Sequence, residues 1–108
     1  LDEASIKKII QGDWQQKDNE NFTITITGDT LMEVNNGNDR GTETFTFTVT
    51  QTNCNKDPLS SSLTGFYLTE MSMDNNKPLC GAIDAVNATH LKLTYNNGDQ
   101  IMEFIRPQ

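Results

Sequence analysis

Few residues of this chain are arranged for covalent chemistry. Nucleophilic catalysis needs a base beside the nucleophile, yet His90 is the single histidine, and the serines at 60–62 have no evident partner. Five aspartates fall in predicted turns, where Asp is favoured: Asp29, Asp39, Asp57, Asp74 and Asp99. No glycine-rich phosphate loop or EF-hand spacing is present. We therefore predict a protein that is not an enzyme and that holds no metal and no cofactor.

The two cysteines, Cys54 and Cys80, carry the remaining reactive groups. Two thiols and one histidine are too few for a structural metal site. The sequence therefore predicts one disulfide, which indicates an oxidising compartment such as a periplasm or a cell surface. The alternative is a pair of buried free thiols.

Length and charge restrict the partners. A chain of 108 residues is expected to form one domain, residues 1–108. The formal net charge of −7 argues against nucleic acid and against anionic membranes as partners. No apolar run approaches membrane-spanning length. We expect a monomer, and a sequence that starts at Leu1 rather than Met is interpreted as a mature or trimmed form.

The hydrophobic pattern predicts one short helix followed by strands. Isoleucines at 6, 9 and 10 have helical spacing within 2–11, and Gly12 suits the helix end. After it, apolar residues alternate with threonines and other polar residues. This pattern predicts eight strands: 13–17, 22–27, 30–35, 42–52, 65–73, 79–86, 90–95 and 100–106. We predict a small antiparallel eight-stranded barrel, all-β apart from the helix, with a five- or six-stranded OB-like barrel as the alternative.

The strand pattern also predicts which side chains face the interior: Trp14, Phe22, Ile24, Ile26, Val34, Phe45, Phe47, Val49, Phe66, Leu68, Ile83, Leu91, Leu93, Met102 and Phe104. Several of these are bulky, and strands of about six residues make a short barrel. We therefore expect a packed core rather than a binding cup.

The longest break in the pattern, 53–64, gives the most suggestive candidate site. A Cys54–Cys80 disulfide would fasten the base of this loop, and a preorganised loop loses less entropy on binding. We predict a protein-binding loop made of Asn55, Lys56, Asp57, Pro58, Leu59, Ser60, Ser61, Ser62 and Leu63. The turn at 75–78 is a second candidate. The alternative is a structural disulfide beside an ordinary surface loop.

Four residues near the two ends of the chain carry a family resemblance. Gly12 and Trp14 in "QGDW", with Phe104 and Arg106 in "MEFIRP", resemble the small lipocalin-like (calycin-like) proteins of Bacteroidetes. The resemblance implies an up-and-down barrel in which the Trp14 ring closes one end and the Arg106 guanidinium lies across it. A flat cation stacks well on indole, and glycine allows a close approach. Such proteins are often exported, so the resemblance implies a periplasmic protein, a cell-surface lipoprotein or a secreted protein.

Size, acidity and the single barrel are similar to those of two groups of secreted protease inhibitors, the staphostatins and the potempins. We predict an exported inhibitor of secreted proteases, of unspecified class, that acts through the loop 55–63 on the barrel rim. Two alternatives stay open. One is a lipocalin-like carrier of a small apolar ligand, and the other is a surface interaction module.

Overall fold

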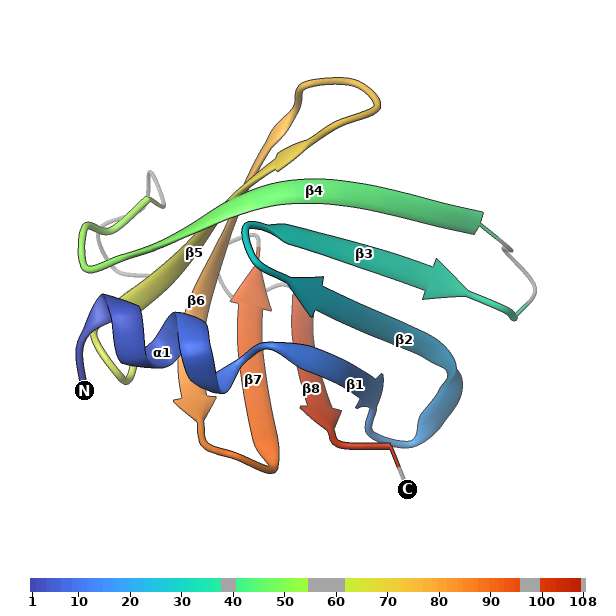
Figure 1. Ribbon diagram of the computed structural model, residues 1–108, viewed down its shortest axis with the longest axis horizontal. Helices are drawn as coiled ribbons and strands as arrows, with labels where there is room; N and C mark the ends of the chain where they lie inside the picture. The colour runs from blue at the N-terminus through green and yellow to red at the C-terminus, as the bar shows by residue number, and fades with distance from the viewer. Residues whose placement is uncertain (38–40, 55–61, 96–99, 108) are drawn as a thin grey trace.

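Strands that alternate apolar and polar residues can bury one face each, and here eight of them close on themselves. The computed structural model describes residues 1–37, 41–54, 62–95 and 100–107. Its elements are α1 (Glu3–Ile9), β1 (Gly12–Gln16), β2 (Asn19–Thr27), β3 (Thr30–Asn35), β4 (Gly41–Thr50), β5 (Phe66–Ser72), β6 (Pro78–Val86), β7 (His90–Tyr95) and β8 (Gln100–Ile105). Each strand pairs antiparallel with the next, and β1 pairs with β8 to close the barrel (Figure 1). The predicted all-β, eight-stranded barrel with an N-terminal helix is confirmed, and the OB-like alternative is wrong.

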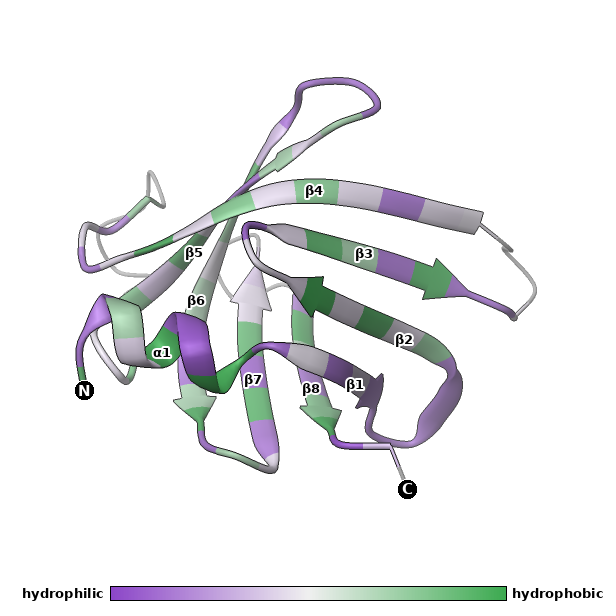
Figure 2. Cartoon of the chain, viewed as in Figure 1, coloured by the Kyte–Doolittle hydropathy of each residue, from purple (hydrophilic) through white to green (hydrophobic). Residues whose placement is uncertain are grey.

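Hydropathy follows the two faces of the strands, as along β2 in Figure 2. All but two of the predicted interior residues belong to the buried core. Phe22 is partly buried. Val34 was predicted to face inward and does not: it lies across from Thr23 and Thr42, on the outer face, because Leu31 occupies the inward register of β3.

Two predicted boundaries change for reasons of backbone geometry. The turn between β1 and β2 is shorter than the predicted 18–21. Asp18 takes a positive φ of 66°, and β2 already begins at Asn19. The helix ends at Ile9 rather than at Gly12. Gly12 is instead the first residue of β1, with a φ of +103°, a conformation that favours glycine.

Helix α1 lies across one end of the barrel and leads into β1 (Figure 1). Asp2 and Ser5 form a capping box at its start. Ile6 and Ile10 are fully buried in the barrel core. The Gln11 amide bonds to both the N–H and the C=O of Gly28, which joins the end of the helix segment to the β2–β3 turn.

The disulfide between Cys54 and Cys80 is present, with the two Cα atoms 5.7 Å apart. It joins the segment after β4 to β6, where Cys80 pairs with Thr69 of the intervening strand β5. This confirms the predicted disulfide over free thiols and indicates an extracytoplasmic location. In the part of the chain that the structure describes, no helix has both the length and the apolar character needed to cross a membrane.

Candidate ligand-binding site at the open end of the barrel

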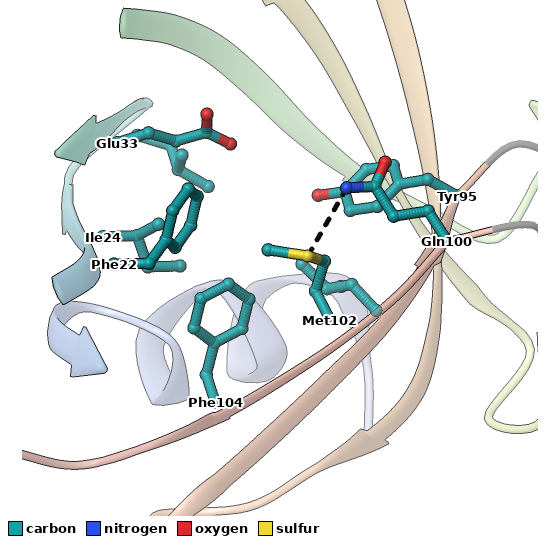
Figure 3. Close-up of a pocket in the computed structure, with 9 residues that line it drawn as sticks. Phe22, Ile24, Glu33, Tyr95, Gln100, Met102 and Phe104 are labelled. Carbon is teal, nitrogen blue, oxygen red and sulfur yellow. Dashed lines mark hydrogen bonds between the residues drawn. The ribbon is translucent and has the colours of Figure 1, made fainter. Parts of the chain in front are cut away.

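The sequence predicted a filled barrel interior. The interior instead holds a cavity of about 180 Å³. Its lining is apolar except for Glu33, Tyr95 and Gln100, and comprises Phe22, Ile24, Leu31, Glu33, Leu93, Tyr95, Gln100, Met102 and Phe104. Figure 3 shows Phe22, Ile24 and Glu33 on one side of it, with Tyr95, Gln100 and Met102 facing them. A cavity of about 150 Å³ can hold benzene, so this one has room for one small ligand.

A second hollow lies beside this cavity and shares Phe22 and Glu33 with it. It measures about 320 Å³, and the rest of its lining is polar: Asn35, Gly41, Thr42, Glu43 and Asp74. The two hollows adjoin at these shared residues, so an acidic hollow borders the apolar cavity.

Three glutamates, Glu33, Glu43 and Glu70, lie at inward register positions on the neighbouring strands β3, β4 and β5. Glu33 lies directly across from Glu43. Glu70 pairs with the core residue Phe47, so it shares the inner face of the sheet. Like charges directly opposite each other destabilise a sheet. The chain thus carries an electrostatic cost at this end of the barrel.

Glu70 is the most deeply buried of the three, with 1% of its surface exposed. Its Oε2 accepts a hydrogen bond of 2.7 Å from the Tyr95 hydroxyl. Its Oε1 is buried and has no hydrogen-bond partner among the described residues. Burial raises the pKa of Glu70 to about 8, against the lowering effect of the Tyr95 bond and with a further increase from Glu33 and Glu43.

The carboxyl of Glu33 is more accessible but also perturbed. Burial, with the charge of Glu43 as the second cause, raises its pKa to about 7. Glu43 accepts a 2.9 Å hydrogen bond from the Ser72 hydroxyl. The open end therefore holds carboxyl groups that retain protons near neutral pH, a property that often marks functional sites.

A glycine makes room for the Tyr95–Glu70 contact. Gly81 pairs with Tyr95 in the β6–β7 register, and a Cβ added there would lie 2.8 Å from Tyr95 Cε1. The absent side chain lets the Tyr95 ring lie against β6 and reach Glu70. Burial, followed by the charge of Glu70, raises the pKa of Tyr95 well above its ordinary value, so the hydroxyl remains a donor.

No basic side chain in the described ranges pairs with these carboxyls. The ion pairs there are Lys7–Asp29 and Lys17–Glu103. The described residues also contain no cluster of His, Cys, Asp and Glu suited to a metal ion. What the site offers is an apolar pocket with carboxyl groups at its outer end.

The opposite end of the barrel is closed by Trp14 and Arg106. The indole is fully buried and donates a 2.9 Å hydrogen bond to the Ile10 carbonyl. The Arg106 guanidinium lies 3.6 Å from the ring centroid. Its nitrogens donate to the carbonyls of Ile9, Asp13 and Ala88 at 2.9, 3.0 and 3.1 Å. A Cβ at Gly12 would lie 3.3 Å from Arg106 Nη1, so glycine there permits the close approach.

The predicted protease-binding loop is largely untested, because residues 55–61 lie outside the described residues. Its last two residues lie against β6. The Ser62 hydroxyl donates to the Ile83 carbonyl, and the Leu63 N–H donates to Asp84 at 3.0 Å. Leu63 itself is 83% exposed. The second candidate, 75–78, lies at the tip of the β5–β6 hairpin (Figure 1), and His90 is exposed at the start of β7.

The glutamates were missed because interior positions were chosen by apolar character alone. A signal was present: Glu43 continues the inward series Phe45, Phe47 and Val49, and Glu70 continues Phe66 and Leu68. Period-two alternation places all of them on one face. A charged residue at an inward position was the available evidence for a site.

No protein-family model and no curated protein matches this chain. Among solved structures, it is similar to a lipocalin-like protein from Bacteroides uniformis ATCC 8492, with a TM-score of 0.58 and 12% sequence identity. The match covers 92% of this chain and 99% of that one. At this identity the likeness shows the fold alone, a lipocalin-like barrel.

Proposed function

We propose that the protein binds a small, largely apolar molecule inside the barrel, as a lipocalin-like carrier. The observation that supports this most directly is the cavity of about 180 Å³ with largely apolar walls, which adjoins an acidic hollow. Apolar pockets with a few convergent polar groups are typical of small-molecule sites. The likeness to a lipocalin-like barrel agrees with this function but shows the fold alone. A ligand with nine or ten non-hydrogen atoms would bind with a dissociation constant of about 10–100 μM.

The four methionines allow the site of binding to be read directly. Met102 lines the cavity, whereas Met32, Met71 and Met73 are exposed outside it. In protein labelled with ¹³C at the methionine methyl groups, 2-phenylethanol should shift the Met102 signal in a saturable manner. The other three signals should stay in place.

A pair of variants on β8 provides the control. Met102→Trp should fill the cavity and weaken 2-phenylethanol binding at least about tenfold, measured by calorimetry. Ile101→Trp adds the same ring at the neighbouring position, which faces outward and is 58% exposed, and should leave binding unchanged. If 2-phenylethanol and toluene both fail to bind the parent protein, the carrier function is wrong.

Inhibition of secreted proteases through 55–63 remains a separate prediction. The supporting observation is the Cys54–Cys80 disulfide at the base of that loop. Titration against secreted metallo-, serine and cysteine proteases tests it, with a variant that lacks 56–62 as the control. Stoichiometric inhibition by the parent that the deletion abolishes, at an unchanged thermal transition, would support the loop. If the deletion variant still inhibits fully, or if the parent protein inhibits no protease, the prediction that this loop inhibits proteases is wrong.

A further inference from the structure

We propose that Phe22 determines the length of ligand that this protein accepts: its ring separates the cavity from the acidic hollow, and its displacement opens one continuous site for an elongated molecule. This inference rests on the proposed carrier function and names its ligand class. The ligand is an amphiphile, with one ring or a short chain in the cavity and an uncharged, hydroxylated end in the hollow.

Phe22 lies at the boundary between the two spaces. Its side chain lines both the cavity and the acidic hollow, a position that it shares with Glu33 among the described residues. The ring is partly buried against the core, and its centroid lies 6.3 Å from that of Phe104. Figure 3 shows it beside Phe104, on the side of the cavity that carries Glu33. A change in the position of this ring therefore changes how far the cavity extends.

The backbone at Phe22 is paired on one side. On β3 it lies across from Asn35. On β1 the pair Gln15–Thr23 is followed by a register shift, so residues 20–22 have no partner residue there. Such irregularities re-aim a side chain, and they concentrate at barrel rims and beside functional sites. The phenyl ring has no hydrogen-bonding group, so it can turn to another rotamer by giving up apolar contacts alone.

The volumes of the two spaces favour a ligand that occupies both. The cavity measures about 180 Å³ and the acidic hollow about 320 Å³. Small-molecule sites commonly measure about 300–1,000 Å³, a range that the cavity reaches only together with the hollow. With the Phe22 ring turned aside, the combined site is apolar at its inner end and polar at its outer end.

The lining of the hollow defines the outer end of the ligand. Asn35 and Thr42 supply an amide and a hydroxyl, and Glu43 and Asp74 supply carboxyls. Hydroxyl groups suit this lining because each of them both donates and accepts hydrogen bonds. An anionic end would meet the carboxyls without a counter-charge, since no basic side chain of the described residues forms an ion pair with them.

Two probes with the same ring and linker test whether the site spans both spaces. 2-Phenylethanol fits the cavity, and 2-phenylethyl β-glucoside adds a hydroxylated head that is too large for it. Titrated calorimetrically into the full chain, the glucoside should bind about as tightly as the alcohol, because contacts of the head offset the displacement of the ring. Methyl β-glucoside, which is the head alone, should not bind.

NMR shows where each probe lies. Met102 lines the cavity and Thr42 lines the hollow. In protein labelled with ¹³C at the methyl groups of methionine and threonine, both probes should shift the Met102 signal. The glucoside alone should also shift the signal of Thr42.

A matched pair of variants assigns the length limit to Phe22. Phe22→Leu and Phe104→Leu make the same change in neighbouring rings, and in the described structure Phe104 lines the cavity but not the hollow. Phe22→Leu should raise the affinity for the glucoside relative to 2-phenylethanol about tenfold, because less apolar surface has to be displaced. Phe104→Leu should leave this ratio within about twofold of the parent value. Thermal unfolding checks that each variant is folded, and Phe22→Met replaces Phe22→Leu if that variant is unstable.

The outcomes distinguish this proposal from the carrier function. If the glucoside binds neither the parent nor Phe22→Leu while 2-phenylethanol binds, the two spaces do not form one site, and the proposal is wrong while the carrier function stands. The same conclusion follows if the glucoside binds Phe22→Leu alone, because the ring is then a fixed wall. Equal changes of the ratio in Phe22→Leu and Phe104→Leu would also overturn the role of Phe22. If neither probe shifts the Met102 signal of the parent protein, the carrier function itself fails.

Discussion

The two ends of this barrel use polar groups in opposite ways. At the closed end, Arg106 donates three hydrogen bonds to backbone carbonyls and covers the indole of Trp14, whose own N–H is bonded. At the open end, Glu33 faces Glu43, and Glu70 keeps an oxygen without a partner in the described structure.

The difference indicates which end serves stability and which is available for binding. Polar groups that satisfy one another hold α1, β1 and the β6–β7 turn together at the closed end. Unsatisfied buried carboxyls reduce stability, and such arrangements concentrate at functional sites. If this distinction is correct, substitutions at the closed end should destabilise the fold, and substitutions at the open end should alter pH dependence and binding.

The largest effect is expected for Trp14→Ala. Removing a fully buried Trp should reduce the free energy of unfolding by about 3–5 kcal/mol, because the helix would rest on a void. Urea denaturation measures the loss. A variant with the same urea midpoint as the parent would show that this end does not stabilise the barrel.

The next effect is a pH dependence of stability that originates at the open end. The folded-state pKa values of Glu33 and Glu70, about 7 and 8, lie above the ordinary value of 4.5. The folded state therefore binds more protons than the unfolded state between these values, and its stability falls as pH rises. We expect a loss of several kcal/mol between pH 5 and pH 8, with Glu70 as the larger contributor. Denaturation at a series of pH values measures this slope.

Glu70→Gln should flatten that slope and make the protein more stable at pH 8, because a neutral amide can still accept the Tyr95 hydrogen bond. Glu20→Gln is the matched control at an exposed position. A parent protein whose stability is constant between pH 5 and pH 8 would contradict the contrast between the two ends.

Arg106→Lys tests the closed end, because it keeps the positive charge but replaces the planar guanidinium with an ammonium group. Lysine cannot stack a planar cation on the indole while reaching three carbonyls. We expect a loss of about 2 kcal/mol in the free energy of unfolding. Lys17→Ala, at a partly exposed ion pair with Glu103, should cost under about 1 kcal/mol. Equal losses in the two variants would mean that Arg106 acts as an ordinary surface charge.

Apart from the Lys17→Ala control, the smallest effect is expected for Gly81→Ala at the open end. The added methyl group would displace the Tyr95 ring, with a loss of about 1–2 kcal/mol. The Tyr95 contact with Glu70 should also weaken, which raises the pKa of Glu70 further because that hydrogen bond lowers it. A carboxyl-resolved NMR titration measures this second effect. An unchanged titration would show that the ring does not control Glu70.

Much of the fold could be predicted because it depends on local pattern. The alternation in 22–27 and 42–52 predicts strands that bury one face, although β4 itself ends at Thr50, and the isoleucines of 2–11 predict an amphipathic helix. The disulfide followed from the number of cysteines. The exact turn at Asp18 was not predictable from the pattern, because Asn19 and Asn21 are turn-favouring residues that here belong to β2.

The site was harder to predict, because a cavity depends on how side chains from non-adjacent strands meet. Met102 and Phe104 approach Phe22 and Ile24 across the barrel, and no residue count gives the space left between them. The loop 55–63, which drew attention by its length, lies mostly outside the described residues.

By itself, the sequence determined the eight strands and the helix, since side-chain alternation and residue type act over a few neighbouring positions. The closure of one end by Trp14 and Arg106 was expected from the family resemblance. The tertiary structure decided that the other end is hollow and that Glu33, Glu43 and Glu70 lie together. Strand register brings distant residues onto one inner face, and burial there removes the water that would otherwise solvate their charge. Their altered pKa values are therefore a property of the folded barrel.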